Sequence, residues 1–212
     1  MLMQARLNSS KQESERTFTE TARRAQIVDA AIEVIADQGY ANASFAKIAK
    51  QAGLSSTGMI SYHFQGKGDL IREVVTRIMT VSAQFISAKL DAESGYRGRM
   101  LAFFSANLAL VDEYPKHLRA LSNIAANAGT DDPHLFGLLD QLGSVSATQA
   151  EILRAGQRDG VFREFDPVVM VMAIRGSLDA AIARKATDPN FDAAATAREL
   201  ADLFDRATRK DA

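Results

Sequence analysis

The prolines of this chain are the feature that most constrains its fold. Three of the four follow an aspartate, at Asp132-Pro133, Asp166-Pro167 and Asp188-Pro189. An aspartate accepts hydrogen bonds from the first N–H groups of a helix, and proline suits the first helical position because its missing N–H would be unpaired there. Tyr114-Pro115 predicts a further helix start or kink. Because Val, Ile and Thr show no sustained strand-like alternation, the sequence predicts an all-α fold of about nine helices.

The composition is that of an ordinary globular protein and excludes several chemistries. The chain has 212 residues and a net charge of -1, which suits one domain or a small domain joined to a larger one. It has no cysteine, so disulfides, cysteine-based zinc sites, iron–sulfur clusters and thiol nucleophiles are excluded. The histidines, His63, His117 and His134, lie far apart, and we expect neither metal nor cofactor. Without a run of about 18 apolar residues or a signal-like start, we expect a cytoplasmic protein that does not enter a membrane.

The first 40 residues predict a polar arm followed by a helix. Residues 1–16 are polar and aperiodic, which is typical of a disordered arm. The capping box Thr17-Phe18-Thr19-Glu20 predicts the start of the first helix, and Gly39 predicts its end. Apolar residues fall on one face of this helix, at Ile27, Ala31, Val34 and Ile35.

Two short helices are expected next. Ser44 can cap a helix whose apolar positions are Phe45, Ile48, Ala49 and Ala52. Gly53 allows a tight turn, and Ser55 or Ser56 can cap a third helix that runs to about His63 or Phe64. This order is typical of a helix–turn–helix. A helical corner within a bundle is the alternative interpretation.

Charge favours a helix–turn–helix that meets an anion. Residues 44–68 contain Lys47, Lys50 and Lys67 but no acid. Lys67 lies at the expected start of a long helix, where the helix dipole disfavours a cation by about 0.3–1 kcal/mol. A bound anion would reverse that cost, and the phosphate backbone of DNA supplies one. The alternative is a solvated surface lysine paired with Asp69.

These segments resemble the signature of the tetracycline-repressor (TetR) family. The matching stretches are Ala52-Gly53-Leu54-Ser55, then Gly58 to Phe64, then Lys67-Gly68-Asp69-Leu70, and Arg24 to Gly39 is similar to the first helix of the family. The resemblance implies a helix–turn–helix DNA-binding domain of three helices over residues 17–66. It also implies a ligand-binding and dimerisation domain, a helical bundle over residues 67–212.

The DNA contacts that the resemblance implies need adjustment for two departures. Four residues separate Gly53 from Gly58 where three are commoner, and Ser61 stands where the family usually has tyrosine. We therefore expect Tyr62 or His63 to make the usual phosphate contact. A phosphate role for Lys67 carries over directly, while readout of base edges would be modest and aided by DNA shape. The expected DNA-binding residues are Ser44, Lys47, Ser55, Ser56, Thr57, Ser61, Tyr62, His63 and Lys67.

The remaining two thirds of the chain are expected to hold a ligand and to dimerise. The resemblance implies a cavity lined by apolar side chains and a few polar ones, although simple core packing is the alternative for each. The candidates are Phe85, Met100, Phe104, Asn107, Tyr114, His117, Phe136 and Met170. A two-fold interface built by the last two helices is implied as well, with internal packing of a monomer as the alternative. Its candidates are Ile174, Leu178, Ala181, Leu200 and Phe204.

The sequence therefore favours a ligand-responsive homodimeric regulator. It would act as a repressor on a pseudo-palindromic operator in double-stranded DNA, and a small, partly apolar effector would release it. An all-α enzyme is disfavoured, because the chain has no G-x-S-x-G, Walker or G-x-G-x-x-G motif. A helical small-molecule-binding or adaptor protein without DNA affinity is the remaining alternative, but it leaves the acid-free lysine window unexplained.

Overall fold

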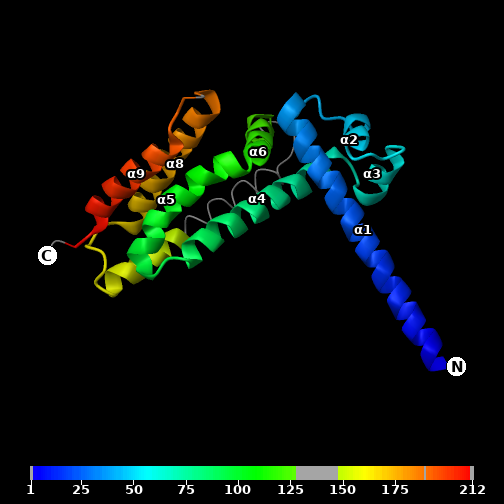
Figure 1. Ribbon diagram of the computed structural model, residues 1–212, viewed down its shortest axis with the longest axis horizontal. Coiled ribbons are helices and arrows are strands. Elements are labelled where there is room, and N and C mark those ends of the chain that lie inside the picture. The colour runs from blue at the N-terminus through cyan, green and yellow to red at the C-terminus, as the bar shows by residue number, and fades with distance from the viewer. Residues whose placement is uncertain (1, 128–147, 189, 211–212) are drawn as a thin grey trace. The chain divides into compact units, whose positions relative to one another are not determined.

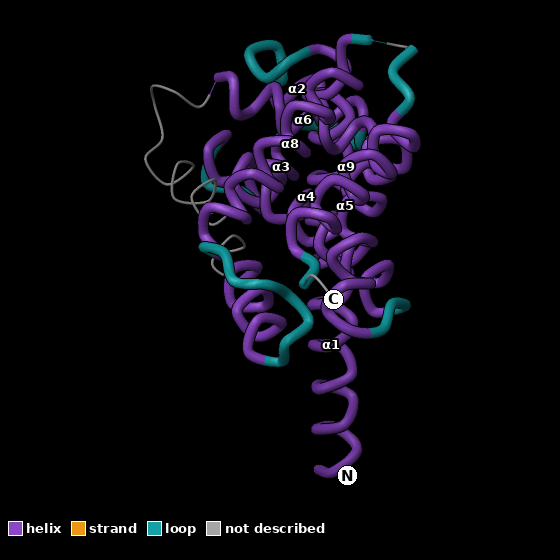
Figure 2. The backbone as a smooth tube through the Cα atoms, turned by 90° about the vertical axis from the view of Figure 1, so that its left-hand side faces the viewer, coloured by secondary structure: helices purple, strands orange, loops and turns teal. Residues whose placement is uncertain are grey.

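The computed structural model describes the backbone of residues 2–127, 148–188 and 190–210, and the side chains from residue 19 onward except residue 186. All regular elements in these ranges are helices (Figures 1 and 2), so the predicted all-α fold is confirmed. A further helical stretch covers 148–158. The labelled helices are α1 (Leu2–Gln38), α2 (Phe45–Gln51), α3 (Gly58–His63), α4 (Lys67–Asp91), α5 (Gly95–Glu113), α6 (Pro115–Asn127), α8 (Pro167–Thr187) and α9 (Ala193–Thr208).

Two of the four prolines open helices as the sequence predicts. Pro115 is the first residue of α6 and Pro167 the first residue of α8. Asp166 caps α8, because its Oδ1 accepts hydrogen bonds from the backbone N–H groups of Val168 at 2.8 Å and Val169 at 3.2 Å. The pair Asp132-Pro133 lies outside the described residues. Proline thus marks helix starts here because its fixed φ suits the first helical turn and its missing N–H is not needed there.

Asp188 does not open a helix; the sequence places the last helix at about residues 192–209, and this start is confirmed. Asp188 is the C-cap of α8, and its backbone leaves the helix with φ of −121°. Helix α9 instead begins at Ala193, where the side chain of Asp192 accepts the backbone N–H of Ala195 at 2.8 Å. Two aspartates four residues apart could each cap a helix, and the second one does.

The first helix is longer than the sequence predicts. Residues 2–16, expected as a disordered arm, are helical, and the helix does not begin at the Thr17–Glu20 capping box. Residues 1–38 contain neither glycine nor proline, so no helix breaker separates the polar segment from the apolar one. The helix ends where expected, since Gly39 takes a left-handed φ of +82°.

The chain forms two compact units. The first comprises Met1–Arg77 and Arg119–Asp132, so the division falls within α4 rather than before Lys67. The core of this unit contains the predicted face of α1 together with apolar residues of α2, α3 and the first turns of α4. The buried side chains include Ile27, Ala31, Val34, Ile35, Ile48, Ala49, Ile60, Phe64, Leu70, Ile71 and Val74. Most of them were recognisable from helical spacing alone.

The second unit comprises Ile78–Leu118 and Pro133–Ala212. In it α5 packs against α8 and α9, which lie side by side (Figure 1). Phe104 of α5 stacks on Phe204 of α9 with ring centroids 5.2 Å apart. Arg97 of α5 donates to Asp205 of α9, with Nη2 at 2.7 Å from Oδ2, and this contact lowers the pKa of the Asp205 carboxyl. No helix in the described ranges is long and apolar enough to span a membrane.

Candidate nucleic-acid interface and ligand cavity

The turn between α2 and α3 has the geometry that its sequence predicts. Ser44 is the N-cap of α2, and its Oγ accepts the backbone N–H of Lys47 at 3.4 Å. Gly53 has φ of +65°, and the N–H of Leu54 bonds the carbonyl of Ala49 at 2.8 Å, which closes the turn. Neither Ser55 nor Ser56 caps α3; Thr57 holds that position without a side-chain hydrogen bond. Ser44 and Gly53 therefore fix α2, while the hydroxyls before α3 stay unused by the fold.

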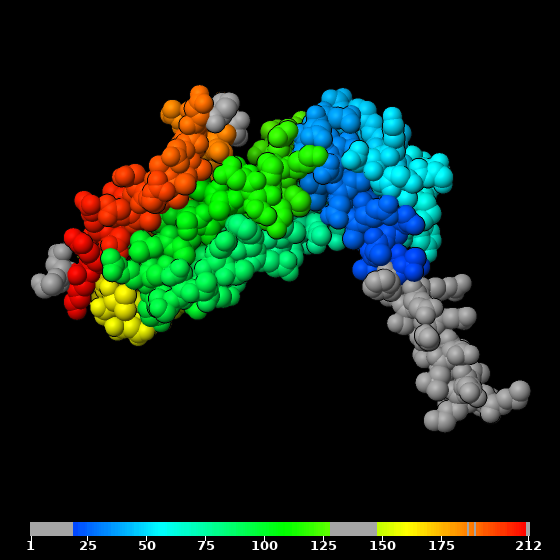
Figure 3. Space-filling view, viewed as in Figure 1, coloured from blue at the N-terminus to red at the C-terminus, as the bar shows by residue number. Residues whose placement is uncertain are grey.

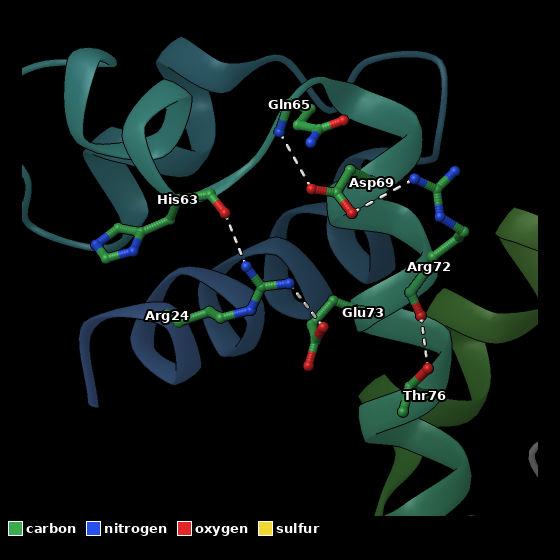
Figure 4. Close-up of polar contacts among 7 residues, drawn as sticks. All are labelled: Arg24, His63, Gln65, Asp69, Arg72, Glu73 and Thr76. Atoms are coloured by element: carbon green, nitrogen blue, oxygen red, sulfur yellow. Dashed lines mark hydrogen bonds and ion pairs between the residues drawn. The ribbon is translucent and has the colours of Figure 1, made fainter. Parts of the chain in front are cut away.

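A single arginine of α1 holds the end of α3. Arg24 donates through Nη1 to the carbonyl of His63 at 2.7 Å and through Nη2 to Oε2 of Glu73 in α4 at 2.9 Å (Figure 4). Its guanidinium also lies 4.4 Å from the ring centroid of Phe64. One planar group therefore contacts α3, the residue that follows it and α4, which sets the direction in which α3 points.

The start of α4 is organised by two separate contacts. Lys67 Nζ donates to the carbonyl of Tyr40 at 2.8 Å and lies 4.4 Å from the centroid of its ring. Partial burial lowers the pKa of the Lys67 ammonium. Asp69 accepts the backbone N–H of Gln65 at 3.1 Å and pairs with Arg72 at 3.4 Å (Figure 4). The alternative pairing of Lys67 with Asp69 is therefore not the arrangement found.

The predicted DNA-binding side chains form one exposed set on α2, α3 and the turn. We call this set the hydroxyl–lysine face; it consists of Ser44, Lys47, Ser55, Ser56, Thr57, Ser61 and Tyr62, all exposed. His63 and Lys67 are half-buried. In the described ranges Lys47 and its neighbour Lys50 have no acidic partner. Hydroxyl and ammonium groups that the fold leaves unpaired are the donors that phosphate oxygens accept.

One acid lies close to this face although the sequence window contains none. The hydroxyl of Tyr62, which is 71% exposed, donates to Oε1 of Glu20 in α1 at 3.3 Å. Sequence reasoning missed Glu20 because it stands 42 positions before Tyr62. The sequence pattern instead assigns Glu20 to a capping box at the helix start. A carboxylate therefore occupies one acceptor position that a phosphate oxygen would need.

The second unit contains a cavity of about 300 Å³. Its wall is mainly apolar and comes from the end of α4, the start of α5, the 148–158 helix with the segment after it, and α8. The lining residues are Ser87, Leu90, Asp91, Tyr96, Arg99, Met100, Phe103, Gln149, Ile152, Leu153, Phe162, Val171 and Ile174. Its size falls at the lower end of the range for small-molecule sites, about 300–1,000 Å³.

The structure brings only one of the predicted ligand residues, Met100, to this cavity. Phe104 and Asn107 are buried away from the lining, and Asn107 donates to the carbonyl of Phe103 in its own helix at 2.8 Å. Met170 packs partly buried against the core. Phe136 lies outside the described residues.

The other three predicted ligand residues form a separate aromatic group. Tyr114 meets Phe85 edge-on at 5.7 Å and His117 at 5.3 Å between ring centroids. None of the three lines the cavity. The lining residues that sequence reasoning missed include Gln149, Ile152 and Leu153. Their i, i+3, i+4 spacing on one helix was the available signal.

Four of the five predicted dimer residues are buried inside the chain itself. Ile174, Leu178, Ala181 and Phe204 belong to the core of the second unit, and Leu200 is partly buried against it. These residues are therefore not available to a partner, because α8 and α9 use their small and apolar faces to pack on α5. The apolar side chains that α8 and α9 do expose are Val168, Val169, Met172 and Leu203 (the surface of these two helices is orange and red in Figure 3).

Among the described residues, no group of three or more His, Asp or Glu side chains is placed to hold a metal ion.

Known proteins resemble the chain mainly in its first part. Residues 27–74 match the family model described as "Bacterial regulatory proteins, tetR family". The HTH-type transcriptional regulator BetI 1 of Chromohalobacter salexigens is 44% identical over 57 residues, which are 27% of this chain and 28% of that protein. The fatty acid metabolism regulator protein of Bacillus subtilis is 50% identical over 46 residues, 22% of this chain and 23% of that protein. The match thus spans less than a third of either relative.

Solved structures share the fold of most of the chain. A transcriptional regulator from Saccharomonospora viridis, solved in complex with choline, superposes with a TM-score of 0.79. The superposition covers 90% of this chain and all of that one at 21% identity, which is a likeness of fold. The matched segment 27–74 contains the α2–turn–α3 geometry described above. Residues 27–74, which hold the helix–turn–helix of the first unit, therefore match the tetR family of bacterial regulatory proteins.

Proposed function

We propose that this chain is a transcriptional regulator that binds double-stranded DNA through the hydroxyl–lysine face. The observation that carries the proposal is that this face is exposed and belongs to a helix–turn–helix anchored by Arg24. Its Lys47 and the neighbouring Lys50 have no acidic partner among the described residues. Phosphate contacts of this kind position a protein on DNA, while base contacts specify the sequence. With no Arg, Asn or Gln on α3, DNA shape would contribute much of the specificity.

Tyr62 is the better candidate for the phosphate contact that the sequence left open between Tyr62 and His63. Its hydroxyl is exposed and reaches an acidic acceptor already, whereas His63 is half-buried. Lys67 keeps a phosphate role in this proposal, because an ammonium has three donors and Tyr40 takes one.

The regulator would respond to a small molecule bound in the cavity of the second unit. One solved relative holds choline, and one curated relative is named for fatty acid metabolism. Helix α4 connects the two functions along the chain, since it begins at Lys67 and contributes Ser87, Leu90 and Asp91 to the cavity wall. An effector shifts the equilibrium only if it binds the DNA-incompetent state more tightly. We propose a repressor that acts in the cytoplasm and is released by its effector.

The working form would be a homodimer that joins two copies through the exposed face of α8 and α9. Val169 and Met172 are 61% and 68% exposed, and Val168 and Leu203 are exposed as well. Exposed apolar side chains on two neighbouring helices can form a protein interface. A two-fold dimer presents two helix–turn–helix units to two half-sites, which multiplies a weak single contact.

The DNA proposal is tested by fluorescence anisotropy on a labelled duplex from the region upstream of the gene. The logarithm of the affinity should fall linearly with the logarithm of the salt concentration. Replacing Lys47 by alanine should reduce the steepness of this salt dependence, making the slope less negative by about 1, and leave folding intact. Lys185→Ala is the matched control, because Lys185 lies in α8 and pairs with Asp112 at 3.2 Å. An affinity independent of salt would refute recognition through phosphates.

A further inference from the structure

One polar atom at the cavity has no partner within the chain. Gln149 lines the cavity, and its side-chain carbonyl oxygen Oε1 is shielded from solvent without a hydrogen-bond donor in the part of the chain that the structure describes. A buried carbonyl that lacks a donor loses its bond to water and gains nothing in return. Such an atom on the wall of an apolar cavity can accept a hydrogen bond from a bound ligand.

The other polar groups on the wall already have partners. Ser87 Oγ donates to Oδ2 of Asp91 at 3.2 Å, and Oδ1 of the same carboxylate lies 3.9 Å from Nη2 of Arg99. A hydrogen bond from its hydroxyl to the carboxylate of Asp159 raises the pKa of Tyr96. The charges of Asp91 and Arg99 therefore compensate each other, and no lining residue of the cavity carries an unpaired charge.

The charge balance limits the ligand. A carboxylate only accepts hydrogen bonds, so it would face the Gln149 carbonyl with a second acceptor. A cation would need an unpaired acid, and Asp91 is paired on both oxygens. An uncharged ligand meets neither difficulty.

The rest of the wall determines size and polarity. Its apolar side chains are Leu90, Met100, Phe103, Ile152, Leu153, Phe162, Val171 and Ile174. A volume of about 300 Å³ lies at the small end of the range for ligand sites and is enough for a one- or two-ring molecule. The ligand is therefore compact and mainly apolar.

We propose that the effector is a small, uncharged, mainly apolar molecule with a hydroxyl or N–H group that donates a hydrogen bond to Oε1 of Gln149. This inference rests on the proposed function only in calling the ligand an effector. Gln149 is a specificity-determining residue in it: a ligand without the donor leaves the carbonyl unpaired and binds more weakly.

Isothermal titration calorimetry on the full chain without DNA tests the inference. The probes are 4-ethylphenol and 4-ethylanisole, which share a skeleton and differ in the donor, together with 4-ethylbenzoate and 4-ethylphenyl-trimethylammonium. We expect the phenol to bind the wild type about tenfold more tightly than the ether, equivalent to about 1.4 kcal/mol, and the two ions to bind least. Equal binding of phenol and ether, stronger binding of an ion, or no binding by any probe overturns the proposal.

Substitution then assigns the preference to one residue. In Gln149→Met, which keeps the length but removes the acceptor, the tenfold ratio should fall to about twofold or less. In Gln84→Met, a change at an exposed glutamine of α4, the tenfold ratio should persist. A ratio that persists in Gln149→Met overturns the proposal, and because it compares two ligands on one variant, partial unfolding cannot imitate its loss.

The same probes separate this inference from the proposed function. If the phenol binds with the expected ratio but leaves the affinity for DNA unchanged, the cavity assignment stands and the ligand-responsive regulator is refuted. If the phenol and ether bind equally while DNA binding is intact, the assignment of Gln149 is refuted and DNA recognition stands.

Discussion

The two units of this chain place their functional groups in opposite ways. In the first unit, hydroxyls and lysines stand on the outside of two short helices, and the core beneath them is apolar. In the second unit, the cavity and its polar atoms are enclosed by helices from four parts of the chain. A surface of the first kind can be changed without loss of folding, while a change inside the second alters packing and binding together. The following four predictions test this difference, in order of decreasing effect.

The exposed face of α8 offers a test of this difference between the units. If that face forms the dimer interface, a functional site also lies on the surface of the second unit. Met172→Glu puts a charge at a side chain that is 68% exposed in the single chain. If a second copy covers it, we expect a monomer in sedimentation and about a hundredfold loss of DNA affinity, since the half-sites are then bound separately. The control Arg154→Glu, at an exposed residue outside α8, should leave the dimer intact. A monomeric wild type would contradict the proposed interface.

Gly156 tests how tightly the second unit is packed. A Cβ at this position would lie 2.5 Å from the ring of Phe162, closer than such atoms approach. Gly156→Ala should destabilise the chain by about 1–3 kcal/mol in urea unfolding, because Phe162 must move and the cavity that it lines must change shape. Gly98→Ala in α5, whose nearest neighbour would be the flexible Glu93 side chain at 3.4 Å, should be neutral or slightly stabilising. Equal effects would show that the two sites are packed alike.

Acid should weaken the second unit through Asp205. Its pKa lies below the ordinary value because of Arg97, so the folded chain binds fewer protons at this carboxyl than the unfolded chain. The stabilisation is complete above the unfolded pKa of about 3.9 and is lost as pH falls through the folded value. The urea midpoint should therefore fall between about pH 5 and 3, and less steeply in Asp205→Asn. Asp179→Asn, which alters an exposed pair with Arg175, should not change that slope.

The smallest effect is expected at the DNA-facing surface. Glu20→Gln removes the carboxylate that holds the Tyr62 hydroxyl and repels phosphate. The affinity for DNA should rise about threefold to tenfold at low salt, with no change in the urea midpoint. Glu113→Gln, an acid of α5 in the second unit, should leave the affinity unchanged. A loss of affinity in Glu20→Gln would mean that the contact orients Tyr62 productively.

Local signals account for most of the helix boundaries that could be predicted. Ser44, Gly53, Pro115 and Pro167 each mark a boundary through their own hydrogen-bonding groups or their own φ, so no distant residue is needed. Asp192 marks the start of α9 in the same way, because its side chain accepts the backbone N–H of Ala195. The long α1 was missed because the polarity of residues 2–16 argued against order, while their lack of Gly and Pro permits a helix.

The two sites differ in how far sequence could define them. The residues of the hydroxyl–lysine face are neighbours in the chain, so composition over 25 positions was sufficient to locate them. Glu20 was not found, because its closeness to Tyr62 depends on how α1 packs. The cavity wall needs four segments at once, and an apolar residue such as Ile174 gives no local sign of whether it meets a ligand, a partner or the core. Gln149 could be identified as a candidate ligand contact only from the structure, which shows that its Oε1 has no hydrogen-bond donor among the described residues.

The three contacts of Arg24 have a mechanical consequence. Because one guanidinium ties the end of α3 to α1 and to the second turn of α4, we expect these segments to move together. A group of segments that moves together can change its direction without any of its helices unfolding. Amide hydrogen exchange in α3 would accordingly stay slow whether the regulator is bound to DNA or released from it, and only the direction of α3 would differ.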